Sequence, residues 1–228
     1  MESKLQRIIQ IAILLFVIII LTYSCKKKSS KISTTVTEFD GNVYDAVTIG
    51  TQTWMKKNLN VTHYRNGDII PNVTDNTWGT LTTGAYCDYN NTPSNSTTYG
   101  RLYNWYTVVD TRNLCPTGWH IPSDSEWTIL TTYLGGDSIA RGKLKEAGLS
   151  HWHRPNTGAT NVTDFTALPA GYRDTKGAFS SIDYYGSWWS STECDNAHAW
   201  SRSMFYDYSY TFNISDKQGG ISVRCIKD

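Results

Sequence analysis

The sequence lacks an excess of charge of either sign. Its 21 basic and 20 acidic side chains give a formal net charge of +1 at pH 7. Residues 1–24 contain two of the basic side chains and one of the acidic ones, so the chain that follows them is neutral. Proteins that bind nucleic acid usually concentrate positive charge on one face. This charge balance therefore indicates no nucleic-acid partner.

The motifs of several common enzyme classes are also absent. The chain has no Gly-x-Ser-x-Gly nucleophile elbow, no Walker phosphate-binding loop and no His-Glu-x-x-His zinc motif. It also has no internal repeat of solenoid period. We therefore predict no catalytic residue, no metal site and no enzyme activity.

Only one apolar run is long, and it lies near the N-terminus. Residues 8–21 are almost entirely apolar and follow two basic side chains. As a helix this run would reach about 21 Å, which is shorter than the roughly 30 Å of a hydrocarbon core. We therefore predict a secretion signal over residues 1–24. The alternative is an uncleaved signal anchor, which the basic residues Lys26–Lys28 would favour.

The end of the apolar run resembles a bacterial lipobox. In Leu21-Thr-Tyr-Ser-Cys25 a small residue precedes a cysteine, which would be lipidated and become the new N-terminus. We therefore predict a bacterial cell-envelope lipoprotein that its lipid holds at the outer membrane, in either leaflet. Lys, Ser and Thr dominate residues 25–37, which predicts a flexible tether. The folded domain is expected over residues 38–228.

The cysteines form an even set once Cys25 is set aside. Cys87, Cys115, Cys194 and Cys225 allow three pairings, and an oxidising envelope compartment favours bonded cysteines. Our hypothesis joins Cys115 with Cys225, which would close a loop of about 110 residues and contribute on the order of 4 to 5 kcal/mol. Cys87 and Cys194 are then the remaining pair. The alternative is that both are simply small buried residues.

The clearest local structure signal of the domain is a helix start. Ser123 and Glu126 have the spacing of a capping box, so a helix should begin near Asp124. Apolar residues then recur at helical spacing, and Gly135-Gly136 supplies a stop. Weaker patterns predict two further helices, at 102–109 and 137–147.

Alternating apolar residues and turn residues predict an antiparallel sheet. Apolar residues on both sides of Gly50-Thr51 predict a hairpin over 41–55, and Asn66-Gly67 is a strong hairpin turn. Further strands are expected at 84–89, 165–168, 171–173, 186–192, 199–206, 209–212 and 220–226. The predicted fold class is therefore α+β, with two main helices packed on a twisted antiparallel sheet and long loops over its far side.

A series of motifs along the chain resembles one known family. The motifs are Tyr99-Gly-Arg-Leu-Tyr-Asn-Trp105, Cys115-Pro-Thr-Gly-Trp-His-Ile-Pro-Ser-Asp-Ser-Glu-Trp127, Ala167-Leu-Pro-Ala-Gly-Tyr-Arg173, Trp188-Trp-Ser-Ser-Thr-Glu193 and Ser222-Val-Arg-Cys-Ile-Lys-Asp228. Together they resemble the Fibrobacter succinogenes major paralogous domain over about residues 40–228. That family occurs in secreted proteins and lipoproteins of Bacteroidetes and related bacteria. The resemblance implies an envelope protein, but most members have no assigned activity.

That family in turn looks like a branch of the C-type-lectin-like fold that also holds formylglycine-generating enzymes. Ile121–Trp127 is similar to a Leu-Pro-Thr-Glu-Ala-Glu-Trp run of those enzymes, and Ser222–Cys225 to their terminal Gly-Phe-Arg-Cys. The resemblance implies chain ends that meet and long loops that form a variable surface. Those enzymes bind copper through two cysteines shortly before the terminal motif, whereas residues 200–216 contain no cysteine. Thiolate ligation of copper is therefore excluded there.

Aromatic residues supply the best binding hypothesis. If Ser187–Ser190 is a strand, Trp188 and Trp189 point to opposite faces, so one can be core while the other faces the loops. Such rings stack on sugars or anchor protein interfaces, and arginines orient a ligand by hydrogen bonds. The candidate ligand-binding residues are Trp188, Trp189, Trp200, Arg202, Tyr172 and Arg173. The alternative is that most of these rings pack in the core.

Two groups of residues have the chemistry of metal ligands. His151 and His153 would lie on one side of a strand, but no third ligand is identifiable, which favours ordinary surface histidines. Glu193, Asp195 and Asn196 carry oxygen donors suited to calcium, and a solvated acidic loop is the alternative. The calcium-binding motifs of sugar-binding C-type lectins are absent. We therefore predict no cofactor, with calcium as the alternative.

These features together predict a lipid-anchored envelope protein whose lectin-like domain binds a glycan or a surface protein without chemistry. One alternative is a degenerate or unrecognised enzyme of the formylglycine-generating type, which would need a deep pocket with converging ionisable groups. Another alternative is a purely structural surface component.

Overall fold

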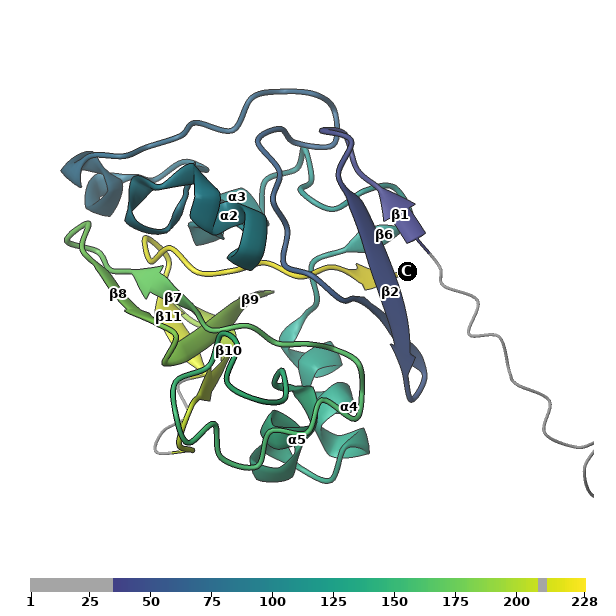
Figure 1. Ribbon diagram of the computed structural model, residues 1–228. Coiled ribbons are helices and arrows are strands. Elements are labelled where there is room, and N and C mark those ends of the chain that lie inside the picture. The colour runs from purple at the N-terminus through teal and green to yellow at the C-terminus, as the bar shows by residue number, and fades with distance from the viewer. Residues whose placement is uncertain (1–34, 209–212) are drawn as a thin grey trace, which may run out of the picture. The chain divides into compact units, whose positions relative to one another are not determined.

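The computed structural model describes residues 35–208 and 213–228 (Figure 1). The α-helices of this part are α2 (Pro93–Tyr99), α3 (Trp105–Val108), α4 (Asp124–Tyr133) and α5 (Asp137–Leu144), and the 3-10 helices are η1 (Asn76–Thr80) and η2 (Tyr89–Asn91). The strands are β1 (Thr35–Thr37), β2 (Val43–Ile49), β3 (Gln52–Met55), β4 (Tyr86–Cys87), β5 (Leu102–Tyr103), β6 (Trp119–His120), β7 (Ala170–Arg173), β8 (Phe179–Ile182), β9 (Tyr185–Glu193), β10 (His198–Phe205), β11 (Ile214–Asp216) and β12 (Ile226–Lys227). The fold is a mixed α/β fold with four α-helices and curled antiparallel sheets in the described part.

Several predictions concern residues outside this described part. The signal peptide at 1–24, the lipidation site Cys25 and the strand at 209–212 all lie there. The predicted tether ends earlier than expected, because Thr35–Thr37 forms β1 and pairs with β2. None of the helices in the described part has the length and hydropathy of a membrane span.

One sheet joins the beginning of the described chain to its end. Its strand order is β1-β2-β3-β12-β6, and each neighbouring pair is antiparallel. The predicted hairpin is confirmed, because β2 and β3 meet at a turn in which Gly50 has a φ of 62°. Strand β12 enters between β3 and β6, where Ile226 lies opposite both Trp54 and His120. The last strand is therefore an interior strand of the sheet that the first strands begin.

The predicted disulfide between Cys115 and Cys225 is confirmed. The two Cα atoms are 6.0 Å apart, both residues are buried, and the bond links the segment before β6 to the segment before β12. The second predicted pair is wrong, because Cys87 and Cys194 are free. Cys87 lies on β4 inside a small hydrophobic cluster, and burial raises the pKa of its thiol to about 12. It is the small buried residue that the alternative interpretation describes.

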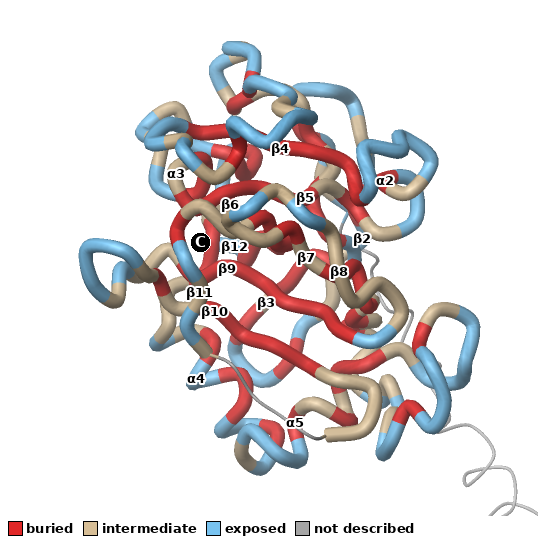
Figure 2. The backbone as a smooth tube through the Cα atoms, turned by 90° about the vertical axis from the view of Figure 1, so that its left-hand side faces the viewer, coloured by how far each residue is buried: buried red, intermediate tan, exposed pale blue. Residues whose placement is uncertain are grey.

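The second sheet has the order β11-β10-β9, and its strands β9 and β10 run through the interior of the domain (Figure 2). Strand β11 lies at its exposed edge. Trp188 and Trp189 lie on opposite faces of β9, as predicted, and each belongs to a different hydrophobic cluster. Helices α4 and α5 lie below the β9–β10 hairpin in Figure 1, and α2 and α3 lie above it. Strand β9 is therefore covered on both faces.

Helix α4 begins at Asp124, as predicted, and its apolar face packs into the hydrophobic cluster that contains Trp188. The hydroxyl of Ser123 accepts the N–H of Glu126, whose carboxylate accepts the N–H of Ser123. The Trp127 ring lies 4.6 Å from that of Trp54 between centroids, and Leu130 is fully buried beside them. Burying side chains of this size contributes roughly 1.5–3 kcal/mol each. The capping box therefore places α4 where its apolar face covers the sheet.

Three predicted elements differ from the structure. The strand predicted at 220–226 is reduced to isolated bridges at 220–222, because these residues bridge to three different segments, and only Ile226 lies in a strand, β12. The helix predicted at 102–109 is shorter, because Leu102 and Tyr103 pair with β4 as β5 and the side chain of Asn104 caps a helix of Trp105–Val108. The predicted strand at 165–168 is a loop with one bridge, between Ala167 and Lys145. Helix α2 and strands β8 and β11 were not predicted.

Two buried cations, Arg224 and Lys145, hold the loop at 165–168 and the end of β10 in place. Arg224 is fully buried, and its guanidinium donates to the side-chain oxygen of Asn58 and to the carbonyls of Phe165 and Thr166. Burial lowers the pKa of Arg224 to about 9. Lys145 is also fully buried and donates to the carbonyl of Phe205 at 3.1 Å. The long irregular segments are therefore tied to the sheet by side chains far away in the sequence.

Candidate functional site

A groove of about 490 Å³ lies between the β7–β8 hairpin and the sheet β11-β10-β9. Its lining residues come from β7 and the turn after it, from β8, from the start of β9, from both ends of β10, and from β11 with the residues after it. They are Tyr172, Arg173, Asp174, Thr175, Ser181, Tyr185, His198, Phe205, Ile214, Ser215, Asp216, Gly219 and Ile221. This groove is the candidate functional site.

Three aromatic rings form a continuous set within the groove. Tyr185 and Phe205 lie opposite each other in the β9–β10 register, so their rings share one face of the sheet. Their centroids are 4.6 Å apart, and the Tyr172 ring meets that of Tyr185 edge-on at 5.6 Å. Tyr185 is buried, whereas Tyr172 and Phe205 are half-buried. Burial raises the pKa of Tyr185, so its hydroxyl stays protonated at neutral pH.

Polar side chains occupy the rim of the groove. The Nδ1 atom of His198 lies 2.8 Å from a carboxylate oxygen of Asp195, and its Nε2 atom lies 3.3 Å from one of Asp216. On the opposite wall, the carboxylate of Asp174 accepts the backbone N–H groups of Lys176 and Ala178. The groove therefore combines an aromatic interior with carboxylates, an imidazole and hydroxyls at its edge.

Of the predicted binding residues, Tyr172 lies in the groove and is partly accessible. Arg173 also lines the groove, but only 1% of its surface is exposed. Its guanidinium donates to the carbonyls of Val73 and Asp75 at 2.6 Å each, and it lies between the rings of Trp78 and Phe179. The guanidinium of Arg173 is therefore used within the protein, where its hydrogen bonds hold the loop before η1 against β7, and contact of Arg173 with a ligand stays a prediction.

The two neighbouring tryptophans are not ligand residues. Trp188 and Trp189 are each fully buried, in contrast to the prediction that one faces the loops. The indole N–H of Trp188 donates to the side chain of Asn58 at 2.7 Å, and that of Trp189 donates to the carbonyl of Tyr103 at 2.7 Å. Since helices and loops cover both faces of β9, both rings are core residues.

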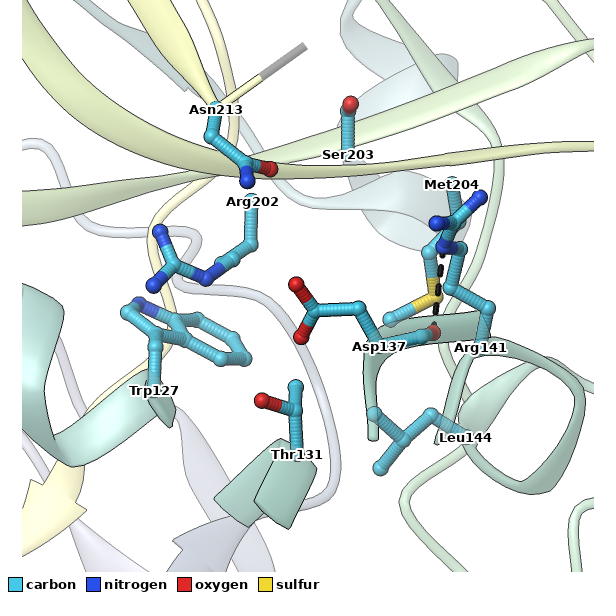
Figure 3. Close-up of a pocket in the computed structure, with 9 residues that line it drawn as sticks. All are labelled: Trp127, Thr131, Asp137, Arg141, Leu144, Arg202, Ser203, Met204 and Asn213. Carbon is cyan, nitrogen blue, oxygen red and sulfur yellow. Dashed lines mark hydrogen bonds between the residues drawn. The ribbon is translucent and has the colours of Figure 1, made fainter. Parts of the chain in front are cut away.

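Arg202 and Trp200 are not among the residues that line the groove. Arg202 lines a separate cavity of about 20 Å³ between β10 and helices α4 and α5, on the face of β10 opposite Phe205 (Figure 3). This volume suits about one water molecule. Arg202 pairs with the carboxylate of Asp124 and donates to the hydroxyl of Thr128, so it holds the first turn of α4. Trp200 is half-buried and lies opposite Ile214 of β11.

The residues considered as metal ligands have other partners. His151 contacts the carboxylate of Glu146, and Asp195 contacts His198. Glu193 pairs with Lys217, which is buried and also donates to the carbonyl of Asn196. Across residues 35–208 and 213–228, no group of three His, Cys, Asp or Glu side chains has the geometry of a metal site.

Sequence reasoning missed the groove residues Phe205, His198 and Asp216. Tyr185 belongs to the aromatic run around Trp188, but nothing in that run shows that its ring borders a groove. The signal that selects Tyr185 and Phe205 is the pairing register of β9 with β10, which becomes visible only in the folded chain.

Comparison with known proteins identifies the family but not the activity. No curated protein and no solved structure is a match for this chain. The sequence pattern of the Fibrobacter succinogenes major domain matches residues 47–227, a span that includes the disulfide, the groove and all the described strands except β1 and part of β2. The chain therefore belongs to the Fibrobacter succinogenes major domain family.

Proposed function

We propose that this domain is a non-catalytic binding module of an envelope lipoprotein and that it holds a glycan in the groove between β7–β8 and β11. The observation that carries the proposal is the set of three rings, Tyr172, Tyr185 and Phe205, beneath a polar rim. Aromatic faces attract the C–H faces of pyranose rings, and polar groups around them bind the sugar hydroxyls.

The rim of the groove has the donors and acceptors that a sugar needs. Ser181 and Ser215 carry hydroxyls, and Asp174 and Asp216 carry carboxylates that accept from sugar hydroxyls. The volume of about 490 Å³ lies within the range of small-ligand sites. A neutral ligand rich in hydroxyls fits this combination better than an anion, because carboxylates from two walls would repel one.

The walls of the groove are held rigidly, which favours binding. Tyr185 and Phe205 lie on paired strands, and the buried guanidinium of Arg173 ties β7 to the loop before η1. A site that is already ordered loses less conformational entropy when a ligand binds. The fold thus supplies a preformed surface rather than one that the ligand must assemble.

The envelope location is part of the same proposal. Cys25 would carry the lipid, residues 26–34 would lead to the domain, and the Cys115–Cys225 bond suits an oxidising compartment. The C-type-lectin-like relationship inferred from the motifs also belongs to the proposal. Mass spectrometry of the protein isolated from membranes would show a lipidated N-terminal cysteine.

The binding experiment compares one groove variant with one distant variant. Wild-type protein is screened on a glycan array, and affinities are then measured by calorimetry for Tyr172→Ala and for Tyr133→Ala. Tyr133 is 65% exposed on α4 and does not line the groove. We expect Tyr172→Ala to weaken binding about tenfold, which corresponds to the loss of one ring contact, and Tyr133→Ala to bind normally.

Two outcomes would contradict this proposal. One is an array on which the wild-type protein retains no glycan, and the other is an equal loss in both variants. Release of shortened glycan from the array would instead support the alternative of an enzyme, with His198 as the group to substitute next.

A further inference from the structure

A second group of rings, exposed or half-buried, lies at the end of the β9–β10 hairpin where Tyr185 and Phe205 line the groove. The imidazole of His153 is stacked on the ring of Tyr184, with centroids 4.3 Å apart and an interplanar angle of 19°. Tyr206 meets both rings edge-on, at 5.4 Å from His153 and 5.3 Å from Tyr184. Tyr184 is 40% exposed, and His153 is exposed as well. Tyr206 is half-buried and packs with one edge of the hydrophobic cluster that contains Trp188. We call these three residues the aromatic platform.

The aromatic platform is fixed by backbone hydrogen bonds from three segments. The N–H of His153 donates to the carbonyl of Asp183 at 2.7 Å, and the N–H of Tyr206 donates to that of Tyr184 at 3.0 Å. The N–H of Thr157 donates to the carbonyl of Tyr206 at 2.7 Å. Exposed rings on mobile loops would lose entropy on binding, whereas these rings are already held in place.

The aromatic platform and the groove share adjacent residues of the chain. Tyr184 directly precedes Tyr185 of the groove, and Tyr206 directly follows Phe205. Tyr184 and Tyr206 lie just outside the two strands. Tyr206 packs against the cluster that contains Trp188, and Trp188 lies on the face of β9 opposite to Tyr185. The platform and the groove therefore lie on two sides of one end of the hairpin.

We infer that the aromatic platform of Tyr184, His153 and Tyr206 is a second sugar-binding subsite and that the ligand is an oligosaccharide which passes around this end of the hairpin. The inference rests on the proposed function of the groove. Pyranoses linked through equatorial bonds suit both subsites, because each of their faces carries C–H groups that stack on an aromatic ring. A single sugar would occupy only the groove.

The test measures affinity against chain length. The probes are two series of β-1,4-linked oligosaccharides, of glucose and of N-acetylglucosamine, from the monosaccharide to the hexasaccharide. We expect the affinity of the wild-type protein to rise with chain length. Tyr184→Ala should weaken binding of the hexasaccharide about tenfold and leave the shortest bound sugars unchanged, whereas Tyr172→Ala should weaken every length. Tyr133→Ala and unchanged melting temperatures serve as controls.

The outcomes separate this inference from the proposed function. Affinity that does not rise with length, or a Tyr184→Ala effect that is the same at every length, overturns the platform while the groove stands. If no sugar of either series binds the wild-type protein, the platform is overturned too, and the array then decides about the groove. The platform and the groove are both supported if Tyr184→Ala loses affinity only for the longer oligosaccharides while Tyr172→Ala loses affinity at every length.

Discussion

The middle of the β9–β10 hairpin and the end formed by Tyr185 and Phe205 both carry aromatic rings, but the rings are buried to different degrees. In the middle, Trp188 and Trp189 have no exposed surface, and each indole N–H has a partner in the protein. At that end, Phe205 is half-buried, and Tyr184, just before β9, is 40% exposed. What differs is coverage, because α4 and the long loops cover the middle fully and leave Tyr184 and Phe205 at the end partly accessible. Rings that are neighbours in the sequence are therefore core or surface according to what packs above them.

The largest effect should come from removing a covered ring. Trp188→Ala would leave a cavity and should lower the free energy of unfolding by about 3–5 kcal/mol. Tyr184→Ala, only four residues away, should lower it by less than about 1 kcal/mol, because that ring is exposed. Urea denaturation followed by circular dichroism measures both. Equal losses in the two variants would remove the distinction between core and surface rings.

The disulfide should have the next largest effect. It links the segment before β6 to the segment before β12, across a sequence separation of 110 residues. The double variant Cys115→Ser with Cys225→Ser should lose about 2–5 kcal/mol of stability. The matched control is Cys194→Ser, since Cys194 is free and partly exposed. A reductant that destabilises wild type and leaves the double variant unchanged would confirm the cause.

Loss of the hydrogen bonds of the buried Arg173 should lower both the free energy of unfolding and the glycan affinity. Arg173→Met would leave carbonyls such as those of Val73 and Asp75 without their donor and should cost about 2–3 kcal/mol. Glycan affinity should fall as well, because Arg173 positions the wall that carries Tyr172. Lys176→Met, an exposed cation on the same hairpin, is the control. Normal stability and affinity in Arg173→Met would show that these hydrogen bonds do not hold the wall of the groove.

His120 should make a smaller contribution to the free energy of unfolding, and this contribution should depend on pH. Burial disfavours its charged form, but hydrogen bonds to Asp228 and Glu126 outweigh burial and raise its pKa above 6.5. Because the folded state holds the proton more tightly, this contribution is complete below about pH 6.5 and is lost as pH rises through the raised pKa. The ring is 41% exposed, so the change should stay below about 1 kcal/mol. His120→Gln should abolish this part of the pH dependence, and a slope that persists in the variant would have another origin.

Local signals in the sequence were enough to predict part of the fold. The capping box of Ser123 and Glu126 and the turn at Gly50 depend on residues a few positions apart, and both were correct. The helix predicted at 102–109 was too long, because the spacing of Leu102, Trp105 and Val109 did not reveal that Leu102 pairs with β4. Elements made by distant pairing, such as β5 and β11, therefore escaped prediction.

The candidate site was harder to predict than the fold, because exposure depends on distant segments. Arg173 and Trp188 were chosen for their chemistry, but loops from elsewhere in the chain bury both. Tyr172 was chosen on the same grounds and does line the groove. No local pattern distinguishes these cases, since coverage is decided only when the sheets and loops come together.

The most direct test of the account is a titration followed by amide resonances. A β-1,4-linked hexasaccharide that the wild-type protein binds is added to labelled protein, and shifts are recorded for each residue. We predict that the shifts concentrate at Tyr172, Tyr184, Tyr185, Phe205 and Tyr206 and leave Trp54, Trp127 and Leu130 of the α4-covered core unchanged. Shifts that concentrate outside the groove and the aromatic platform, or no shifts at all, would contradict the claim that the partly accessible end of the hairpin is the binding surface.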